Sequence, residues 1–224
     1  MPSPTPDTPT DEQPSRRGRR KEARPGELIE AALDLFVEKG FAAARVEEIA
    51  ARAGVSKGTL FLYYGSKEEL FKAVVRHSII DCFAEWNEQF EAWQGSSAEL
   101  VRMCLNAWWD RIGTTRASGI TKLMFSEAQN FPDVVAFYER EVIAPCHSLL
   151  RRVLERGLAR GEFAIADIDY AIYTLVAPMI FLVLHKHSLG CGAGRMPIDP
   201  QRYIAAQAVT LLRGLCVRPA ESGQ

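Results

Sequence analysis

The stretch "GVSKGTLFLYYGSKEEL", residues 54–70, gathers many of the side chains in this sequence that could do chemistry. Glycines, lysines, hydroxyl groups and aromatic rings lie within a few helical turns of one another. Two chemistries fit such a set: a glycine-rich loop that holds a phosphate group, and a surface that contacts DNA. A third interpretation is a tight turn between packed helices, with glycines for backbone freedom and aromatic residues for the core.

The order of the residues argues against a phosphate-binding loop. Such a loop follows a β-strand and ends in Gly-Lys followed by Ser or Thr. Here residues 46–53 have a helical period, and Gly58 is followed by Thr59. A plain turn explains Gly54 and Leu60. It does not explain why Phe61 should lie on the outer side of a short helix, since an exposed aromatic ring lowers solubility unless a partner covers it.

A helix-turn-helix motif accounts for the whole stretch. Its first helix carries an apolar stripe about two turns long, formed by Val46, Ile49, Ala50 and Ala53. Gly54 can adopt the left-handed conformation that ends this helix, and Ser56 can cap the next one. We expect Leu60 and Tyr64 to face inward, four residues apart. A capping box, Ser66 with Glu69, then begins a long following helix.

In this interpretation the second helix of the motif enters a DNA major groove with its first residues forward. We expect the following residues to contact DNA: Arg45, Ser56, Lys57, Gly58, Thr59, Phe61, Tyr63 and Lys67. Hydroxyl groups and the Lys67 ammonium suit phosphate oxygens, whereas Lys57 can reach guanine O6 or N7. Gly58 lets the helix approach closely, and Phe61 can pack on a thymine methyl group or a sugar.

Residues 26 to about 72 resemble the DNA-binding domain of the TetR family of bacterial transcription regulators. The segments "ALDLFVEKGF" and "VEEIAARAGVSKGTLFLYYGSKEELF", and the spacing between them, carry the resemblance. It implies that Thr59, Tyr63 and Lys67 contact the DNA backbone. It also implies that Lys57, Gly58 and Phe61 face bases. A homodimer that binds a palindromic operator, and a small-molecule effector, are implied as well.

Arg45 departs from the family's pattern. Members often carry Thr or Ser just before the Val that starts the first helix of the motif, where the hydroxyl caps the helix and touches phosphate. Arginine cannot cap, but its guanidinium can pair with a phosphate group. Glu47 and Glu48 favour the helix dipole instead, and they would repel a phosphate at which they pointed.

A basic run precedes the motif. Between residues 16 and 24, six positive charges stand against one acidic residue, Glu22, for a local charge of +5. Two interpretations remain open for Arg16, Arg17, Arg19 and Arg20: a solvated terminus, or contact with a narrow minor groove beside the major-groove helix. Residues 1–15 are rich in proline and poor in apolar side chains. We expect residues 1–21 to form a flexible basic tail, residues 22–75 the DNA-binding domain, and residues 76–224 a ligand-binding and dimerisation domain.

The composition fits a globular chain without a metal or cofactor. The 224 residues are 47% apolar and 25% charged, with a net charge of −1. Five cysteines, Cys82, Cys104, Cys146, Cys191 and Cys216, include no C-x-x-C pair, which disfavours disulfides and zinc. His185 and His187 are two residues apart on a predicted helix, so they cannot share one metal. Since no apolar run approaches 18 residues, we expect a cytoplasmic protein that does not bind a membrane.

The periodicity predicts an all-α fold: an N-terminal three-helix bundle with the helix-turn-helix, followed by a larger helical domain. Beyond the motif we expect helices at roughly 67–94, 98–113, 119–130, 133–160, 167–188 and 200–217. Pro178 should kink the helix that contains it. The last two helices are apolar over more than one face, which suits dimerisation.

Several side chains of the larger domain are candidates to line an effector pocket, although an apolar stripe is more often core. The candidates are Met103, Trp108, Trp109, Met124, Phe125, Glu127, Tyr173, Phe181 and His185. We therefore expect a DNA-binding repressor that a small apolar or aromatic ligand releases. Two alternatives are a DNA-binding regulator without a ligand and an α-helical enzyme, although the sequence shows no catalytic constellation.

Overall fold

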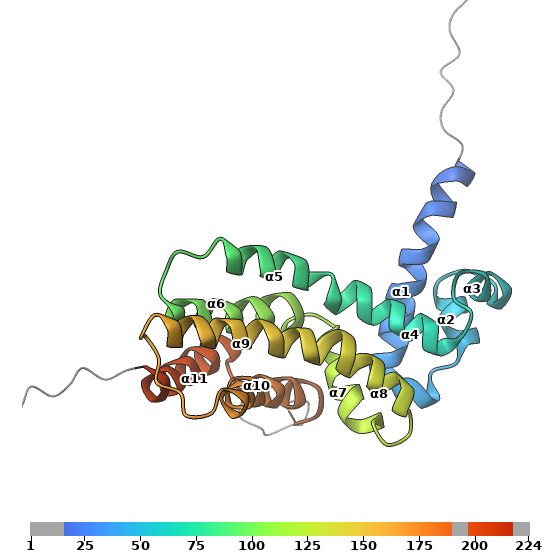
Figure 1. Ribbon diagram of the computed structural model, residues 1–224. Coiled ribbons are helices and arrows are strands. Elements are labelled where there is room, and N and C mark those ends of the chain that lie inside the picture. The colour runs from blue at the N-terminus through green and yellow to red at the C-terminus, as the bar shows by residue number, and fades with distance from the viewer. Residues whose placement is uncertain (1–15, 190–196, 217–224) are drawn as a thin grey trace, which may run out of the picture.

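The computed structural model describes residues 16–189 and 197–216, and these residues are helical apart from short connections (Figure 1). One isolated bridge pairs Phe163 with Cys216, and the described residues contain no β-strand. The predicted all-α fold is confirmed.

The N-terminal bundle consists of α1 (Arg16–Ala43), α2 (Val46–Arg52), α3 (Lys57–Tyr63) and the start of the long helix, α4 (Lys67–Val75). α1 begins at Arg16, so the part of the expected tail from residue 16 onward is helical in the structure. Arg, Lys, Glu and Ala favour a helix there, and the helix continues through Pro25 although proline lacks an N–H and its ring crowds the carbonyl group four residues earlier. Residues 1–15 lie outside the described range.

The remaining helices are α5 (Cys82–Glu91), α6 (Ser97–Trp108), α7 (Ser118–Glu127), α8 (Pro132–Tyr138), α9 (Ala144–Ala159), α10 (Ile168–Leu184) and α11 (Pro200–Leu215). Their positions match the expected helices to within a few residues. Four five-residue π-helical turns continue them: η1 (Arg76–Ile80), η2 (Trp109–Gly113), η3 (Glu139–Ile143) and η4 (His185–Leu189). The sequence analysis did not foresee these turns.

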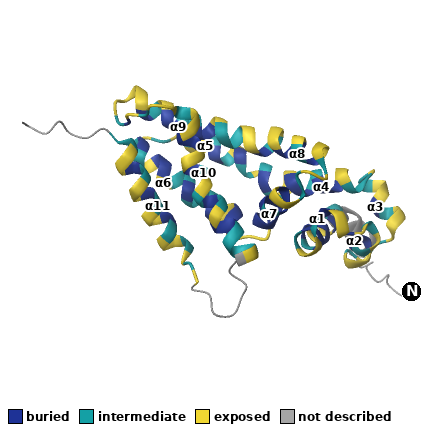
Figure 2. Ribbon diagram, turned by 90° about the horizontal axis from the view of Figure 1, so that it is seen from below, coloured by how far each residue is buried: buried dark blue, intermediate teal, exposed yellow. Residues whose placement is uncertain are grey.

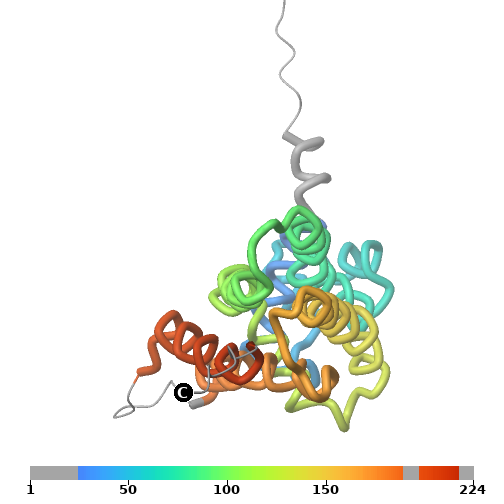
Figure 3. Tube along the Cα trace, turned by 60° about the vertical axis from the view of Figure 1, so that its left-hand side comes forward, coloured from blue at the N-terminus to red at the C-terminus, as the bar shows by residue number. Residues whose placement is uncertain are grey.

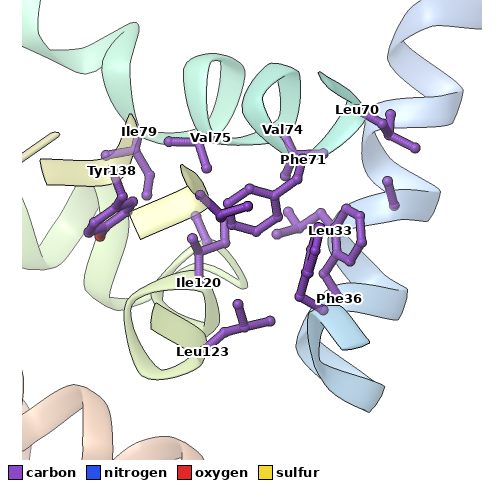
Figure 4. Packing of buried hydrophobic residues seen from close by; sticks show 14 of the residues in the cluster. Leu33, Phe36, Leu70, Phe71, Val74, Val75, Ile79, Ile120, Leu123 and Tyr138 are labelled. Atoms are coloured by element: carbon purple, nitrogen blue, oxygen red, sulfur yellow. The ribbon is translucent and has the colours of Figure 1, made fainter. Parts of the chain in front are cut away.

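The buried apolar side chains form two cores. The first core joins α1–α4 to α7, α8 and the π turns between them. Figure 4 shows side chains from α1, α4 and α7 pointing into the same interior, with Tyr138 at its edge. The second core lies between α6, α9, α10 and α11. The first core therefore does not stop at the expected boundary after residue 75, because α7 and α8 complete it.

α1 packs closely on α7. A Cβ atom on Gly119 of α7 would lie 2.5 Å from Val37 Cγ1, so only glycine allows this approach without a shift. α2 and α3 lie at one end of the molecule, and α10 and α11 lie toward the other (Figures 1 and 2). In the view of Figure 3, α11 lies at the edge of the bundle beside α10.

Candidate nucleic-acid interface

The turn and the cap of the helix-turn-helix form as the sequence predicts. Gly54 has a φ of 66°, in the left-handed region, and α2 ends there. The Ser56 side chain accepts a hydrogen bond from the Thr59 N–H at 3.0 Å, and the two hydroxyl groups lie 2.9 Å apart. This cap fixes the first turn of α3, where unpaired N–H groups can meet an anion.

The outward face of α3 differs from the prediction. Leu60 is fully buried, whereas Leu62 is 82% exposed and Phe61 is 39% exposed. Tyr63, which we expected to face outward, is half-buried against the first core. A helix turns about 100° per residue, so Leu62 lies nearly opposite Leu60, whereas Tyr63 lies only about 60° from Leu60. Leu62 is therefore an outward residue that the sequence reasoning missed.

Lys57 and Glu47 form an ion pair across the motif. Lys57 Nζ lies 2.6 Å from Glu47 Oε1 and 5.7 Å from the centre of the Phe61 ring. The hydrogen bond from Lys57 lowers the pKa of Glu47 below its ordinary value. To contact a DNA base, the Lys57 ammonium group would therefore have to leave the Glu47 carboxylate.

The Lys67 ammonium contacts the end of α1. It donates to the carbonyl oxygens of Phe41 at 2.8 Å and of Ala42 and Ala44 at 3.2 Å, and it lies 4.6 Å from the centre of the Phe41 ring. An ammonium has three N–H groups, and three carbonyl groups accept them. In this geometry Lys67 stabilises the connection between α1 and α2, so its predicted phosphate contact would require these bonds to break.

Arg45 precedes α2 and is exposed. Its side chain makes no capping hydrogen bond, as we expected for arginine, and its guanidinium has no ion-pair partner within the described residues. Ion pairs brace α2 against α1 instead. Arg52 donates two 2.9 Å hydrogen bonds to Glu38, and Lys39 lies 2.9 Å from Glu48. Arg45 thus stays available to a phosphate group beside α3.

The four arginines of the basic run, Arg16, Arg17, Arg19 and Arg20, lie in the first turns of α1. Their side chains are outside the described part of the structure. Contact between these residues and a minor groove therefore stays a prediction.

The candidate effector-pocket residues lie in different surroundings within the described part of the chain. Phe125, Tyr173 and Phe181 are exposed, although they are apolar enough for a core. Met124 belongs to the first core, Met103 packs against the second, and Trp108 touches both.

Glu127, on α7, contacts the end of α1. Its Oε1 is 3.5 Å from the Ala42 N–H, and it would be 2.9 Å from a Cβ atom on Gly40. Glu127 therefore faces the turn between α1 and α2. A role for all nine candidates in one effector pocket stays a prediction, because the spacing of apolar residues along helices does not reveal which faces meet.

Trp109 and His185 do line one cavity, of about 450 Å³. It lies between the end of α6, the end of α10 and the segment before α11. Its lining includes Trp109, Thr114, Leu182, His185, Lys186, Pro197, Ile198 and Pro200. Lys186 was not predicted from the sequence, although its charge at the end of an apolar helix was an available signal.

Other reactive groups give no sign of chemistry. Burial raises the pKa of Cys104 to about 12 and that of Cys146 to about 11, so both thiols stay protonated. Among the described residues, no group of three His, Cys, Asp or Glu side chains could hold a metal ion.

Two sequence families match this chain. "Bacterial regulatory proteins, tetR family" matches residues 28–74, and "Tetracyclin repressor-like, C-terminal domain" matches residues 94–189. The regulator YdeS of Bacillus subtilis is 29% identical over 76% of this chain and 83% of its own length. The repressor KstR2 of Rhodococcus jostii is 28% identical over 72% of this chain and 75% of its own. The activator FasR of Mycolicibacterium smegmatis is 45% identical, but this chain spans only 31% of its length.

Solved structures share the fold. Bacillus subtilis FadR in complex with stearoyl-CoA aligns with a TM-score of 0.70 at 17% identity, covering 84% of this chain and 98% of that one. Mycobacterium tuberculosis KstR2, a ketosteroid regulator, aligns with a TM-score of 0.67 at 22% identity, covering 87% and 96%. The capped helix-turn-helix, the larger helical half and both family matches lead to one conclusion: this chain belongs to the TetR family of DNA-binding transcription regulators.

Proposed function

We propose that this protein is a homodimeric, cytoplasmic repressor of a nearby operon, released from a palindromic operator when a small, mostly apolar ligand binds its effector half. The observation that carries the DNA-binding part is the outer face of α3. Lys57, Phe61 and Leu62 are exposed there, beside the exposed Arg45. A cation and two apolar groups on a short, capped helix suit a major groove, where guanine acceptors and thymine methyl groups are displayed.

The phosphate contacts that we propose come from the first turn of α3 and from Arg45. Ser56, Thr59 and the free N–H groups of that turn present donors to one strand. Lys67 is not in this set, since a phosphate contact would break the bonds by which it holds the connection between α1 and α2 within the DNA-binding bundle itself. Tyr63, half-buried, could contribute only its hydroxyl group.

α10 and α11 supply the proposed dimer interface. Tyr170 is 71% exposed and Tyr173 is 57% exposed on α10, and Phe181 and Val209 extend this apolar surface onto α11. Residues Ile168–Ser188 are also long and apolar enough to cross a membrane by length and composition alone, which is weak evidence for a membrane span because core helices pass the same test. A partner copy would cover the exposed rings and place two α3 helices on successive major grooves.

Ligand release is supported by relatives and by the cavity near Trp109. FadR of Bacillus subtilis was solved with stearoyl-CoA, and KstR2 of Mycobacterium tuberculosis is a ketosteroid regulator. Repression, as opposed to activation, has less support than DNA binding, because similar proteins include both the activator FasR and the repressor KstR2.

A salt-titrated binding assay on the DNA upstream of the protein's own operon tests the proposal. We expect specific binding that weakens as the salt concentration rises, because phosphate contacts release counterions. Equal affinity for that DNA and for a scrambled duplex at every salt concentration would refute it, and would favour an α-helical enzyme. If binding is specific and no candidate ligand changes it, the ligand-free regulator is favoured.

The base-reading role of Lys57 can be tested in the same assay. Lys57→Ala should relax the preference at one base position, at a cost of about 1 to 3 kcal/mol against the preferred base. The matched variant Lys72→Ala removes a lysine from α4 that pairs with Glu69, and it should leave the base preference unchanged. Uniform weakening on all sequences by Lys57→Ala would instead place Lys57 on phosphate.

A further inference from the structure

The 450 Å³ cavity has the size and lining of a small-molecule site. Most of its wall is apolar, from Trp109, Leu182, Ile198 and two prolines. Among the described residues of the lining, the ionisable groups are the ammonium group of Lys186 and the imidazole of His185. Such a wall favours a ligand with an apolar body and one polar end.

The Lys186 ammonium group determines the chemistry of the ligand's polar end. Its Nζ donates to the carbonyl oxygens of Gly113 at 2.8 Å, Thr114 at 3.0 Å and Thr115 at 3.0 Å, and it lies 3.3 Å from Ser118 Oγ. These acceptors are uncharged, and burial lowers the pKa of Lys186. A carboxylate would form a stronger, charge-assisted hydrogen bond with the same ammonium group.

The acceptors of Lys186 belong to residues 113–118, a loop that also contacts the DNA-binding bundle. On the α10 side, His187 Nε2 lies 2.8 Å from Ser118 Oγ. On the α1 side, Arg116 forms ion pairs with Asp34 and, at 3.3 Å, with Glu30. The 113–118 loop is therefore tied to η4 by one set of bonds and to α1 by another.

Residues of this loop border two cavities. Thr114 borders the 450 Å³ cavity. Thr115, Arg116 and Ala117 border a second cavity of about 270 Å³, which Glu30 and Leu33 of α1 also line. A segment next to free volume can shift without the overpacking that a filled interior would impose.

We propose that the 450 Å³ cavity binds a small amphipathic carboxylic acid, whose carboxylate takes the Lys186 ammonium from the carbonyl groups of residues 113–115. The apolar body of the acid packs on Trp109, Leu182 and Ile198. The loop, released from Lys186, shifts and carries Arg116 away from Asp34 and Glu30, which changes the position of α1. This proposal names the effector class of the proposed regulator and rests on that function.

Binding to the full chain, without DNA, tests the site. Decanoate, decanol and decylamine share one chain and differ in charge, and each can be titrated while tryptophan fluorescence and heat are measured. We expect decanoate to bind about tenfold more tightly than decanol, the factor that a hydrogen bond between charged groups supplies, and decylamine to bind most weakly. Equal affinities for decanoate and decanol, or no saturable binding of any of the three, would overturn the proposal.

Variants of Lys186 test whether its positive charge causes the preference for decanoate. Lys186→Met should reduce the preference for decanoate over decanol to about twofold or less, whereas Lys186→Arg should retain most of it. Lys122→Met makes the same change of charge on α7, outside the cavity lining, and should behave as the wild type. If Lys186→Met does not fold, as judged by circular dichroism, the comparison between Lys186→Arg and wild type still decides, because a lost preference in that folded variant contradicts a charge-based site. A full preference in folded Lys186→Met also contradicts it.

Coupling to DNA is measured separately, by anisotropy of a labelled operator duplex. Decanoate should lower operator affinity, and the duplex should lower decanoate affinity by the same factor. Arg116→Gln should bind decanoate as the wild type does but lose its effect on operator affinity. Decanoate bound through Lys186 with no effect on a functional operator complex would overturn the coupling. Failure of operator binding in the absence of any ligand would instead refute the proposed function.

Discussion

The two cores of this protein differ in shape, in composition and in what they join. The first core is aromatic, with the rings of Phe36, Phe41 and Phe71 in mutual contact at 5.3 to 5.5 Å between centroids. It holds the DNA-binding helices together with α7 and α8. The second core is largely aliphatic, has a cavity at its edge, and leaves one side of α10 exposed.

This difference defines a structural unit. Because α7 and α8 complete the first core, the DNA-binding helices cannot turn as a rigid body at residue 75 without opening a filled interior. The helices α1–α4, α7 and α8 therefore share one packed unit. Trp108, Phe90 and Cys146 pack against both cores, so the two units meet there. The following variants test this division, from the largest expected effect to the smallest.

Phe71→Ala should destabilise the first core by about 3 to 5 kcal/mol, because it removes a fully buried ring and leaves a cavity. Amide hydrogen exchange should then lose protection in α7 and α8 as well as in α1–α4, while α10 and α11 keep theirs. The matched variant Leu175→Ala, buried in the second core, should show the reverse pattern. If the amide protection of α7 changes together with that of α10 in both variants, α7 does not belong to the first core's unit and the division is contradicted.

Lys67→Met should lower the free energy of unfolding by about 1.5 to 3 kcal/mol, since three carbonyl groups lose a charged donor. Denaturant titration measures the loss, and the salt dependence of operator affinity should stay as in the wild type. Lys72→Met on the same helix, where the lysine pairs with exposed Glu69, should cost far less. A reduced salt slope with unchanged stability would show that Lys67 contacts phosphate after all.

Glu162 provides a pH test of the second core. Its carboxylate accepts a hydrogen bond from the Ser97 N–H at 2.5 Å and another from Arg160, and these bonds lower its pKa from 4.5 to about 2. A carboxyl group with a lowered folded-state pKa stabilises the fold above pH 4.5, and this contribution is lost as the pH falls toward 2. Glu162→Gln should thus reduce stability at pH 7 and flatten its decline between pH 4.5 and 2. Denaturation curves across that range check both, and a decline as steep as in the wild type would count against the assignment.

Glu47→Gln should have the smallest effect, on the surface of the first unit. Removing the carboxylate frees Lys57 and removes a negative charge near DNA. We expect affinity for non-specific DNA to rise by about twofold, the size of an exposed ion pair, with a smaller change for the operator. Filter binding on both duplexes measures the ratio. A larger gain for the operator than for random DNA would mean that Glu47 opposes base recognition itself.

Local signals made the helix-turn-helix predictable. Gly54 and Ser56 determine the turn and the cap through their own backbone and side chain, so their roles could be inferred from sequence alone. The hydrogen-bond partners of Lys67 could not be inferred in this way, because they lie 23 to 26 residues earlier in the chain. That Leu62 and not Tyr63 lies on the outer face could have been predicted, because the rotation of about 100° per residue places Leu62 nearly opposite the buried Leu60.

The effector half was predictable in its helices but not in its cavity. Trp109 and His185 come from different helices, and the packing of those helices brings them together. Tyr173 and Phe181 satisfy the same apolar pattern as core residues, yet they face outward. Periodicity indicates that a helix has an apolar side. It does not say whether that side meets a neighbour in the chain, a second copy or a ligand.

The π-helical turn η3 lies within a buried stripe that serves both cores. Val134, Tyr138 and Val142 are buried in the first core, and Leu150 and Leu154 of α9 are buried in the second, at positions that differ by multiples of four. Steps of four rotate by about 40° too far in a regular α-helix, so such a stripe winds around the helix. The wider π turn takes up part of that rotation. Loss of one residue from η3 would turn α9 by about 100° relative to α8, so a relative that lacks this residue must carry its apolar stripe in a different register.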